Sequence, residues 1–323
     1  MLWLLVPAAL ALAVPALAYV CYCIAFRNPP PHREDIHAIP AGEQYQHSRD
    51  TMLRLIDEMD AIPFEQVTIT SYDGTRLSAR YYHVRDSGPV QIQMHGYRGS
   101  AIRDFCGGNK LAREAGINTL VPDQRAHGKS DGKTIAFGLR ERYDCLAWVR
   151  FVRERFGPDT PVTLAGVSMG ASTVLMAAGL DLPDNVKGVI ADCPYDSSVD
   201  IIKKVCRDCH LPPRVFFPLI VLGGRLFGGF DIRQTTVSRE IAKARVPVLI
   251  LHGEDDRFVP CAMSRSIYKA CPTPKLRVTF PGAGHALSYI VDPALYRASV
   301  DRFLEMIDQP GPDPQERTNP PPA

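Results

Sequence analysis

The stretch Gly166-Val167-Ser168-Met169-Gly170 decides the fold, because a serine flanked by glycines in this way marks one particular kind of turn. Residues 161–165 before it read as a short buried strand, and residues 169–180 after it are small and apolar, which favours a closely packed helix. Between a strand and a helix, such a serine lies on a strained turn that exposes its hydroxyl, and the glycines prevent backbone collisions. We therefore predict that Ser168 is a nucleophile and not a helix cap.

A serine hydroxyl needs a base to take its proton, and the base needs an acid to orient it. Downstream of Ser168, an apolar strand at 248–251 runs into an acidic loop that contains Asp255 and Asp256. A second short strand, 276–280, leads into a glycine-rich turn that presents His285. Both candidates follow strands, and open α/β sheets carry their sites at the carboxyl ends of strands. The chain thus holds a serine, an acid and a histidine in the order that one hydrolase class uses.

Five stretches carry a resemblance to a known family: Met94-His-Gly-Tyr-Arg-Gly-Ser100, Asp123-Gln-Arg-Ala-His-Gly-Lys-Ser130, the serine turn, His252-Gly-x-x-Asp256-x-x-Val-Pro260 and Gly284-His285. From about Phe64 to Asp308 the chain resembles the serine hydrolases of the α/β-hydrolase superfamily, in their acyl-ester-hydrolysing and prolyl-oligopeptidase-like branches. The resemblance implies an α/β fold with a mostly parallel central sheet flanked by helices, and a Ser–Asp–His triad. Ala126 departs from the family pattern, which has glycine there, so the turn near the pocket is expected to be altered.

The acid of the triad has three candidates. In the family pattern the acid precedes Val259 by three residues, which selects Asp256 over Asp255. Asp192 follows the strand 189–192, where some relatives carry the acid instead. We predict Asp256 as the acid and His285 as the base.

Three further histidines lie in family motifs, and we expect each of them to bond nearby backbone: His95, His127 and His252. The oxyanion hole requires two backbone N–H groups. One is that of Met169, the residue after the nucleophile, and the resemblance implies that Tyr97 supplies the other. We expect no metal and no organic cofactor.

Residues 1–26 form an uncharged run that is dominated by leucine, alanine and valine, and about 20 apolar residues suffice to span a bilayer core. The competing interpretation is a cleaved signal peptide with a small-residue site at Ala16-Leu-Ala18, but no basic segment precedes the run. We predict an N-terminal transmembrane helix that anchors the chain as a single-pass membrane protein. Because Arg27 and Arg33 follow the run, the catalytic domain is expected to face the cytoplasm.

Composition supports this view and limits the partners. The nine cysteines show no disulfide framework, which suits a reducing compartment. Cys206-Arg-Asp-Cys209-His210 matches a haem attachment motif, but we interpret the match as chance because every other signal is hydrolytic. A formal charge of +2 gives no indication of nucleic-acid binding, and the sequence leaves the oligomeric state open.

The chain divides into four parts. Residues 1–26 form the anchor, and residues 27–63 form a linker followed by an amphipathic juxtamembrane helix at 45–59. Residues 64–308 form the hydrolase domain, which opens with a predicted hairpin of strands 66–71 and 77–84. Residues 309–323 are proline-rich and predicted to be a disordered tail.

An insertion at about 195–245 is too long for a plain connection between strands and is expected to be a helical cap over the serine. Its segment 215–230 is strongly apolar. These side chains either pack the cap onto the domain or form an acyl-binding lid.

These observations predict a serine hydrolase that cleaves carboxylic ester or thioester bonds through an acyl-enzyme, on an apolar or lipid-like acyl substrate. One alternative is a serine peptidase of the same fold, for which Asp196, Asp200 and Asp208 are candidates to bind an amino terminus. The other alternative is a non-catalytic, membrane-tethered binding module.

Overall fold

The computed structural model describes residues 2–30 and 35–308, with side chains from Leu12 onward. The predicted disordered tail, 309–323, lies outside the described residues.

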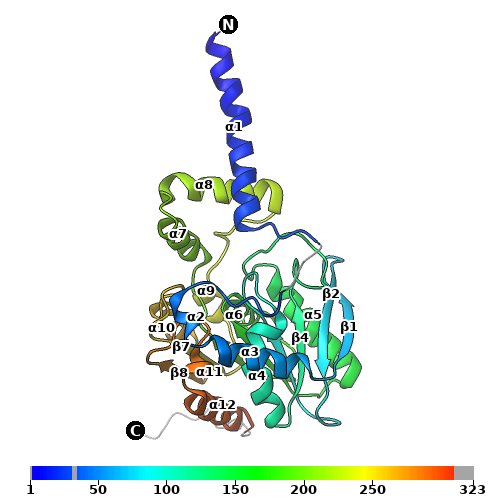
Figure 1. Cartoon of the computed structure of the whole chain (residues 1–323). Coiled ribbons are helices and arrows are strands. Elements are labelled where there is room, and N and C mark those ends of the chain that lie inside the picture. The colour runs from blue at the N-terminus through cyan, green and yellow to red at the C-terminus, as the bar shows by residue number, and fades with distance from the viewer. Residues whose placement is uncertain (1, 31–34, 309–323) are drawn as a thin grey trace, which may run out of the picture.

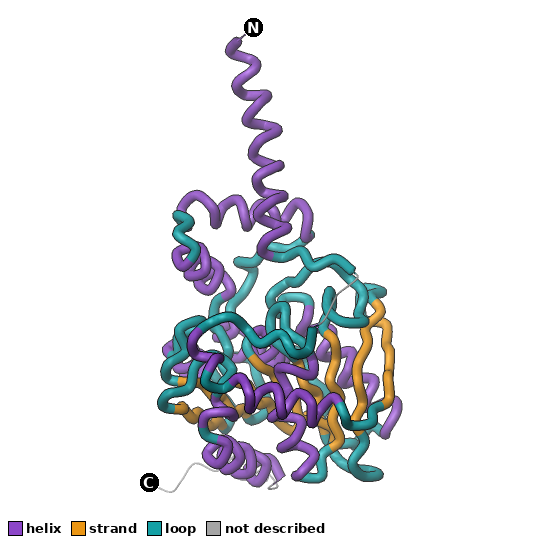
Figure 2. Tube along the Cα trace, viewed as in Figure 1, coloured by secondary structure: helices purple, strands orange, loops and turns teal. Residues whose placement is uncertain are grey.

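An eight-stranded sheet with the order β1-β2-β4-β3-β5-β6-β7-β8 forms the centre of the domain (Figures 1 and 2). The strands are β1 (Glu65–Thr70), β2 (Arg76–Tyr82), β3 (Val90–Met94), β4 (Asn118–Asp123), β5 (Val162–Val167), β6 (Val186–Asp192), β7 (Val248–Gly253) and β8 (Lys275–Phe280). β1 pairs with β2, and β2 with β4, in antiparallel fashion, whereas all pairs from β4 to β8 are parallel. The predicted hairpin and the mostly parallel sheet are confirmed.

Helices cover both faces of this sheet (Figure 1). The helices of the domain are α4 (Ala101–Glu114), α5 (Glu141–Phe156), α6 (Met169–Ala177), α10 (Ala262–Ala270), α11 (Ser288–Val291) and α12 (Pro293–Asp308). Helices α5, α6 and α10 bury their apolar residues against one face, with Trp148 fully enclosed, and α4 and α12 cover the other. β3 and β5 are buried along their whole length because helices lie on both sides of them, and the two buried glutamines of β3, Gln91 and Gln93, hydrogen-bond to each other at 2.8 Å.

The segment before the first strand packs onto the domain. It forms two helices, α2 (Glu43–Gln46) and α3 (Arg49–Asp60), where the sequence predicts one. The amphipathic pattern is nevertheless confirmed, because Leu55, Ile56 and Met59 of α3 are buried in the same core as α4.

Helix α1 (Leu2–Ala25) projects away from the domain, and its C-terminal end contacts α8 (Pro213–Gly223) and η1 (Gly224–Gly228) of the insertion between β6 and β7 (Figure 1). Among the described residues, no helix has the length and apolar character that a membrane crossing requires. The structure therefore does not support the predicted transmembrane helix.

The insertion between β6 and β7 is helical, as predicted. It contains α7 (Ser198–Asp208), α8 (Pro213–Gly223), the π-helix η1 (Gly224–Gly228) and α9 (Val237–Ile241). Helix α8 lies across the end of α1 (Figure 1). The rings of Tyr19 in α1 and Phe227 in η1 meet edge to face at 5.0 Å. Gly223 is required at this crossing, because a Cβ there would collide with the carbonyl oxygen of Ala18. The apolar segment 215–230 thus has α1 as its packing partner.

Candidate active site

Ser168 lies on the turn between β5 and α6, with φ 55° and ψ −114°. This backbone conformation is sterically strained for a residue with a Cβ, and it persists because the surroundings fix it. A Cβ on Gly166 would collide with the backbone of Gly170, and a Cβ on Gly170 would collide with the backbone at Met94. The local sequence therefore requires both glycines, and the predicted strained serine turn is observed.

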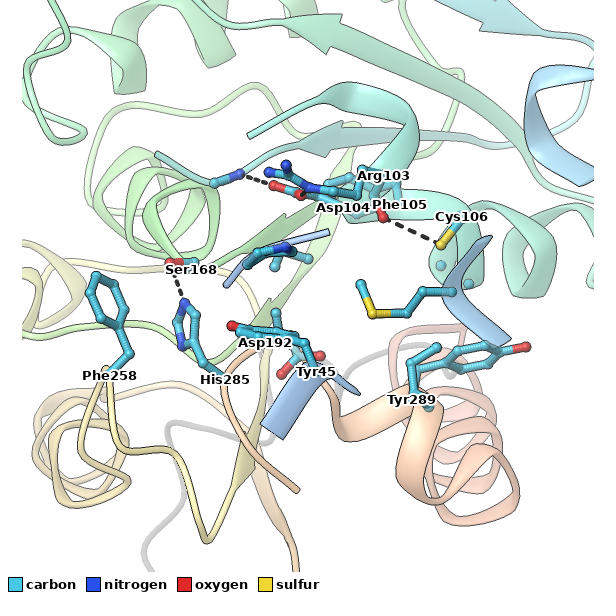
Figure 3. Close-up of a pocket in the computed structure, with 18 of the residues that line it drawn as sticks. Tyr45, Arg103, Asp104, Phe105, Cys106, Ser168, Asp192, Phe258, His285 and Tyr289 are labelled. Atoms are coloured by element: carbon cyan, nitrogen blue, oxygen red, sulfur yellow. Dashed lines mark hydrogen bonds and ion pairs between the residues drawn. The ribbon is translucent and has the colours of Figure 1, made fainter. Parts of the chain in front are cut away.

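His285 lies in the turn after β8 and faces the serine (Figure 3). Its Nε2 atom is 2.9 Å from Ser168 Oγ, and its Nδ1 atom is 2.7 Å from Asp256 Oδ2. All three side chains are buried. Because an ionised carboxylate accepts the Nδ1 proton, Nε2 is left with a lone pair that accepts from the serine hydroxyl. The three residues selected from the sequence are thus brought together in one hydrogen-bonded chain.

Asp256 is held in its ionised form by its surroundings. Burial disfavours the charge, but hydrogen bonds from His252 and His285 outweigh burial and lower the pKa of Asp256 to about 2. Its other oxygen, Oδ1, accepts from the backbone N–H groups of Phe258 and Val259 at 2.9 and 2.7 Å. These amides orient the carboxylate toward His285.

The two rival acids lie elsewhere. Asp255 is exposed. Asp192 is buried at the end of β6, where its Oδ1 accepts from the Ser288 hydroxyl at 3.1 Å. Burial raises the pKa of Asp192 to about 6. Neither residue is hydrogen-bonded to His285 in the way that Asp256 is.

The two expected oxyanion donors flank the serine. Met169 is the first residue of α6, so its N–H has no intrahelical acceptor. Gly96, at the end of β3, approaches the serine so closely that an added Cβ would lie 3.5 Å from Ser168 Cβ, and Tyr97 follows it. The Gly96 N–H donates to Asp104 Oδ2 at 2.7 Å, which ties the Tyr97 loop to α4. The sequence interpretation missed Asp104, and its place in the first turn of a helix directly after the loop was the available signal.

The remaining motif histidines bond backbone, as predicted. His95 Nε2 accepts from the N–H of Gln124 at 3.0 Å, and burial lowers the pKa of His95. His127 Nε2 accepts from the N–H of Arg98 at 3.1 Å. His252 Nε2 donates to the carbonyl of Val259 at 2.9 Å and lies 3.3 Å from Asp256 Oδ2, so it also supports the acid.

Ala126 adopts φ 62°, the left-handed conformation that glycine favours. The turn thus keeps the backbone shape that the family builds with glycine, and no residue of the proposed triad is displaced.

A cavity of about 340 Å³ opens beside Ser168 and His285. Its lining combines the segment 40–52, the first turns of α4, and residues 286–296 of α11 and α12. Figure 3 shows Phe258 next to His285 at one end, and Cys106 and Tyr289 at the other. Gln44 joins the cover to the catalytic turn, because its Oε1 accepts from the His285 N–H at 3.4 Å.

The insertion 195–245 was expected to cap the serine, but another segment covers this cavity. Within the described part of the chain, its lining includes no residue of the insertion 195–245. The insertion packs on α1 instead, and α2 with the start of α3 takes the covering position. Nothing in the sequence of residues 40–52 indicates this role, because their partners lie far away along the chain.

One set of side chains in the described residues has the spacing of metal ligands. Cys193 Sγ lies with ligand atoms of Asp256 and His285 inside 4.8 Å of one another. Burial raises the pKa of the Cys193 thiol well above its usual value. Asp256 and His285 are already bonded to each other, so the set fits a hydrogen-bonded catalytic pair better than a metal centre.

Family models agree with this fold. A model described as "alpha/beta hydrolase fold" matches residues 92–214, and one described as "Serine hydrolase (FSH1)" matches residues 223–287. A strained serine, a histidine and a buried acid on a mostly parallel sheet form a combination that is typical of α/β hydrolases. The chain has the α/β-hydrolase fold and is similar to serine hydrolases over these two stretches.

Related sequences occur in bacteria and in humans. The uncharacterized protein YqkD of Bacillus subtilis is 30% identical over 196 residues, which cover 60% of this chain and 64% of that protein. YfhR of Salmonella typhimurium is 26% identical over 258 residues, or 75% of this chain and 81% of that protein. Human protein ABHD12B is 27% identical over 198 residues, or 58% of this chain and 51% of that protein.

Solved esterase structures share the fold. The Pyrococcus furiosus esterase Pf2001 superposes with a TM-score of 0.63 at 19% identity, covering 87% of this chain and 98% of that one. Est1E from Butyrivibrio proteoclasticus, solved with ferulic acid bound, gives a TM-score of 0.56 at 23% identity, covering 75% of this chain and 100% of that one. At these identities the likeness establishes the fold alone.

Proposed function

We propose that this protein is a serine esterase in which Ser168, His285 and Asp256 form the catalytic triad. The observation that carries the proposal is the continuous hydrogen-bonded chain from Ser168 Oγ through His285 to Asp256, with distances of 2.9 and 2.7 Å. His285 Nε2 takes the hydroxyl proton while Oγ forms a bond to the acyl carbon of an ester or thioester. Asp256 stabilises the imidazolium that results.

The negative charge that develops on the carbonyl oxygen is bound by the backbone N–H groups of Tyr97 and Met169. Each such donor is worth about 3 kcal/mol of transition-state stabilisation. The leaving group departs with the proton from His285, which leaves Ser168 as an acyl ester. Water then gives a proton to His285 and adds to the acyl carbon, and the acid is released as Ser168 regains its proton.

The cavity supports an apolar acyl group as the part of the substrate that stays bound to Ser168 in the acyl-enzyme. Tyr45, Met52, Phe105 and Ile290 line it, and its volume of about 340 Å³ lies at the lower end of small-molecule sites. The aspartates that a peptidase would use, Asp196, Asp200 and Asp208, are not among its described lining residues. The site therefore favours an esterase over a peptidase.

An acyl chain-length panel of p-nitrophenyl esters tests this proposal on the full chain. Hydrolysis that disappears in Ser168→Ala supports it, and absence of Ser168-dependent hydrolysis contradicts it. Met52→Trp fills part of the cavity, so the preferred acyl chain is expected to become shorter. The matched control is Met263→Trp, because Met263 packs beside the insertion and not in the cavity. If the preferred acyl chain length shifts equally in both variants, the cavity does not determine that preference.

We also propose that α1 anchors the enzyme to a membrane with its catalytic domain in the cytoplasm. In the described half of α1, Leu12, Leu17 and Ile24 are exposed to solvent at 76%, 54% and 68%. Such side chains on a projecting helix favour contact with lipid. Membrane fractionation, with protease protection of sealed vesicles, tests both parts. Recovery of the protein in the soluble fraction contradicts the anchor. Protection of the catalytic domain from protease added outside sealed right-side-out vesicles supports the cytoplasmic orientation.

A further inference from the structure

The last turn of α1 lies over the loop that carries the Tyr97 N–H. Tyr97 Oη donates to the carbonyl of Ala25 at 3.0 Å. The Arg98 guanidinium donates to the carbonyls of Ile24 and Arg27 at 3.0 and 3.2 Å. Carbonyls in the last turn of a helix lack intrahelical donors, and the negative end of the helix dipole attracts a cation. The end of α1 therefore accepts hydrogen bonds from both side chains.

The same end of α1 is fixed to the hydrolase domain on its other side. The Ile135 N–H donates to the Phe26 carbonyl at 2.8 Å, and Tyr22 Oη lies 2.6 Å from Thr134 Oγ1. Phe26 is completely buried and its ring meets those of Phe137 and Phe230 at 5.8 and 5.0 Å. The end of α1 is thus fixed to the hydrolase domain, and the loop that carries Tyr97 can be held against it.

The loop itself needs such support. Arg98 adopts φ 49°, a conformation that costs energy for a residue with a side chain and persists only where neighbours hold it. Its N–H donates to His127 Nε2 at 3.1 Å, which fixes one side of the turn. The contacts to α1 fix the opposite side, next to the Tyr97 amide.

We infer that Tyr97 and Arg98 are positioning residues, through which the end of α1 holds the oxyanion-binding loop in its catalytic conformation. This inference rests on the proposed function, because it assigns a purpose to the loop only if the Tyr97 N–H binds an oxyanion. This positioning role makes the end of α1 a contributor to catalysis as well as a part of the fold.

Loss of these contacts lets the loop shift without deleting its N–H group. A misplacement of about 1 Å in a catalytic group can cost on the order of a hundredfold in rate. For Arg98→Ala we expect kcat to fall by about tenfold or more, while KM changes by less than about twofold, since the donor acts on the transition state. Tyr97→Phe keeps the ring and the backbone N–H, and a smaller fall in kcat is expected. Arg98→Lys restores a cation at the helix end and should recover part of the loss.

The test measures kcat, KM and the inhibition constant of an acyl trifluoromethyl ketone on the full chain and these three variants. The ketone forms an oxyanion with Ser168, so its affinity should fall in proportion to kcat. Arg140→Ala is the matched control: Arg140 donates to the Gly229 carbonyl at 2.9 Å and also joins the domain to the insertion, but does not contact the loop. Thermal unfolding of every variant checks that the chain is folded.

The inference predicts that the Arg98 and Tyr97 variants lose kcat and ketone affinity together, whereas Arg140→Ala retains both. It is overturned if folded Arg98→Ala and Tyr97→Phe behave like Arg140→Ala, or if KM rises with kcat unchanged. A parent chain without Ser168-dependent hydrolysis would instead overturn the proposed function, and this inference with it.

Discussion

Two buried aspartates at the ends of neighbouring parallel strands differ sharply in their surroundings. Asp192 ends β6, and Asp256 lies in the loop after β7, the strand that pairs with β6. The pKa of Asp256 is lowered to about 2, whereas that of Asp192 is raised to about 6. Burial acts against ionisation at both sites, so the difference comes from the groups that donate to each carboxylate.

Asp256 receives the stronger set of donors. Two backbone N–H groups bind its Oδ1, while His285 and His252 lie 2.7 and 3.3 Å from its Oδ2. Asp192 receives hydroxyl donors from Ser288 and Tyr296. Hydroxyl groups compensate less for lost hydration than several N–H donors do, so burial prevails at Asp192. A position at a strand end therefore does not by itself make an aspartate a triad acid.

The largest expected effect separates the two acids directly. Asp256→Asn should lower kcat by roughly 10⁴-fold, because the amide favours the wrong tautomer of His285. Steady-state ester hydrolysis measures it. The neighbouring exposed Asp255→Asn should retain the parent kcat. Equal losses in both variants would show that the loop, and not the Asp256–His285 bond, limits the rate.

A second substitution tests the additional donor at Asp256. His252→Leu removes a hydrogen bond to a charged group, and we expect a loss of roughly tenfold in kcat. His252→Gln keeps an N–H donor near the loop and should lose less. If both variants match the parent in kcat, His252 supports the fold only, and His285 alone with the two amides holds the acid.

Asp192→Asn should leave kcat within about threefold of the parent and change the pH dependence of stability instead. Because the folded-state pKa of Asp192, about 6, lies above its usual 3.8, the parent loses stability as pH rises from about 4 to about 6. That loss amounts to roughly 3 kcal/mol and is absent in Asp192→Asn. Urea unfolding at several pH values between 4 and 7 measures the two slopes. A kcat as low as that of Asp256→Asn would identify Asp192 as the working acid.

Ser288→Ala should have the smallest effect. It removes the hydroxyl that donates to Asp192, so the free energy of unfolding at pH 7 should fall by about 1 kcal/mol while kcat is kept. Ser299→Ala is the control, since Ser299 is a buried serine that bonds a carbonyl within its own helix. A larger stability loss in Ser299→Ala would mean that Ser288 contributes little to Asp192.

Much of this site could be predicted from the sequence because its parts are local. The strained turn at Ser168 depends on glycines at adjacent positions, and the acidic and histidine turns follow recognisable strands. The choice of Asp256 came from the spacing to Val259, whose N–H does bind the carboxylate at 2.7 Å. Ala126 shows the limit of such patterns: the turn was expected to be altered, yet the alanine takes the left-handed conformation that glycine favours.

The cover of the cavity could not be predicted, because it depends on contacts between distant segments. The length of the insertion correctly indicated extra helices but contained no information about the direction in which they pack. Its apolar segment 215–230 needed a partner, and α1 supplies one. Residues 40–52 read as linker and juxtamembrane helix, although Tyr45 and Met52 line the cavity together with Tyr289. The bonds from Tyr97 and Arg98 to α1 also join residues about 70 positions apart.

The most direct test of the central claim is covalent labelling by a fluorophosphonate probe. The intact chain is compared with Ser168→Ala and His285→Ala, each shown to be folded by circular dichroism. The account predicts that the parent is labelled at Ser168 and that both variants lose the label, because the serine reacts only when His285 takes its proton. A folded parent that stays unlabelled, or a label that persists in Ser168→Ala, would contradict the assignment of Ser168 as the activated nucleophile.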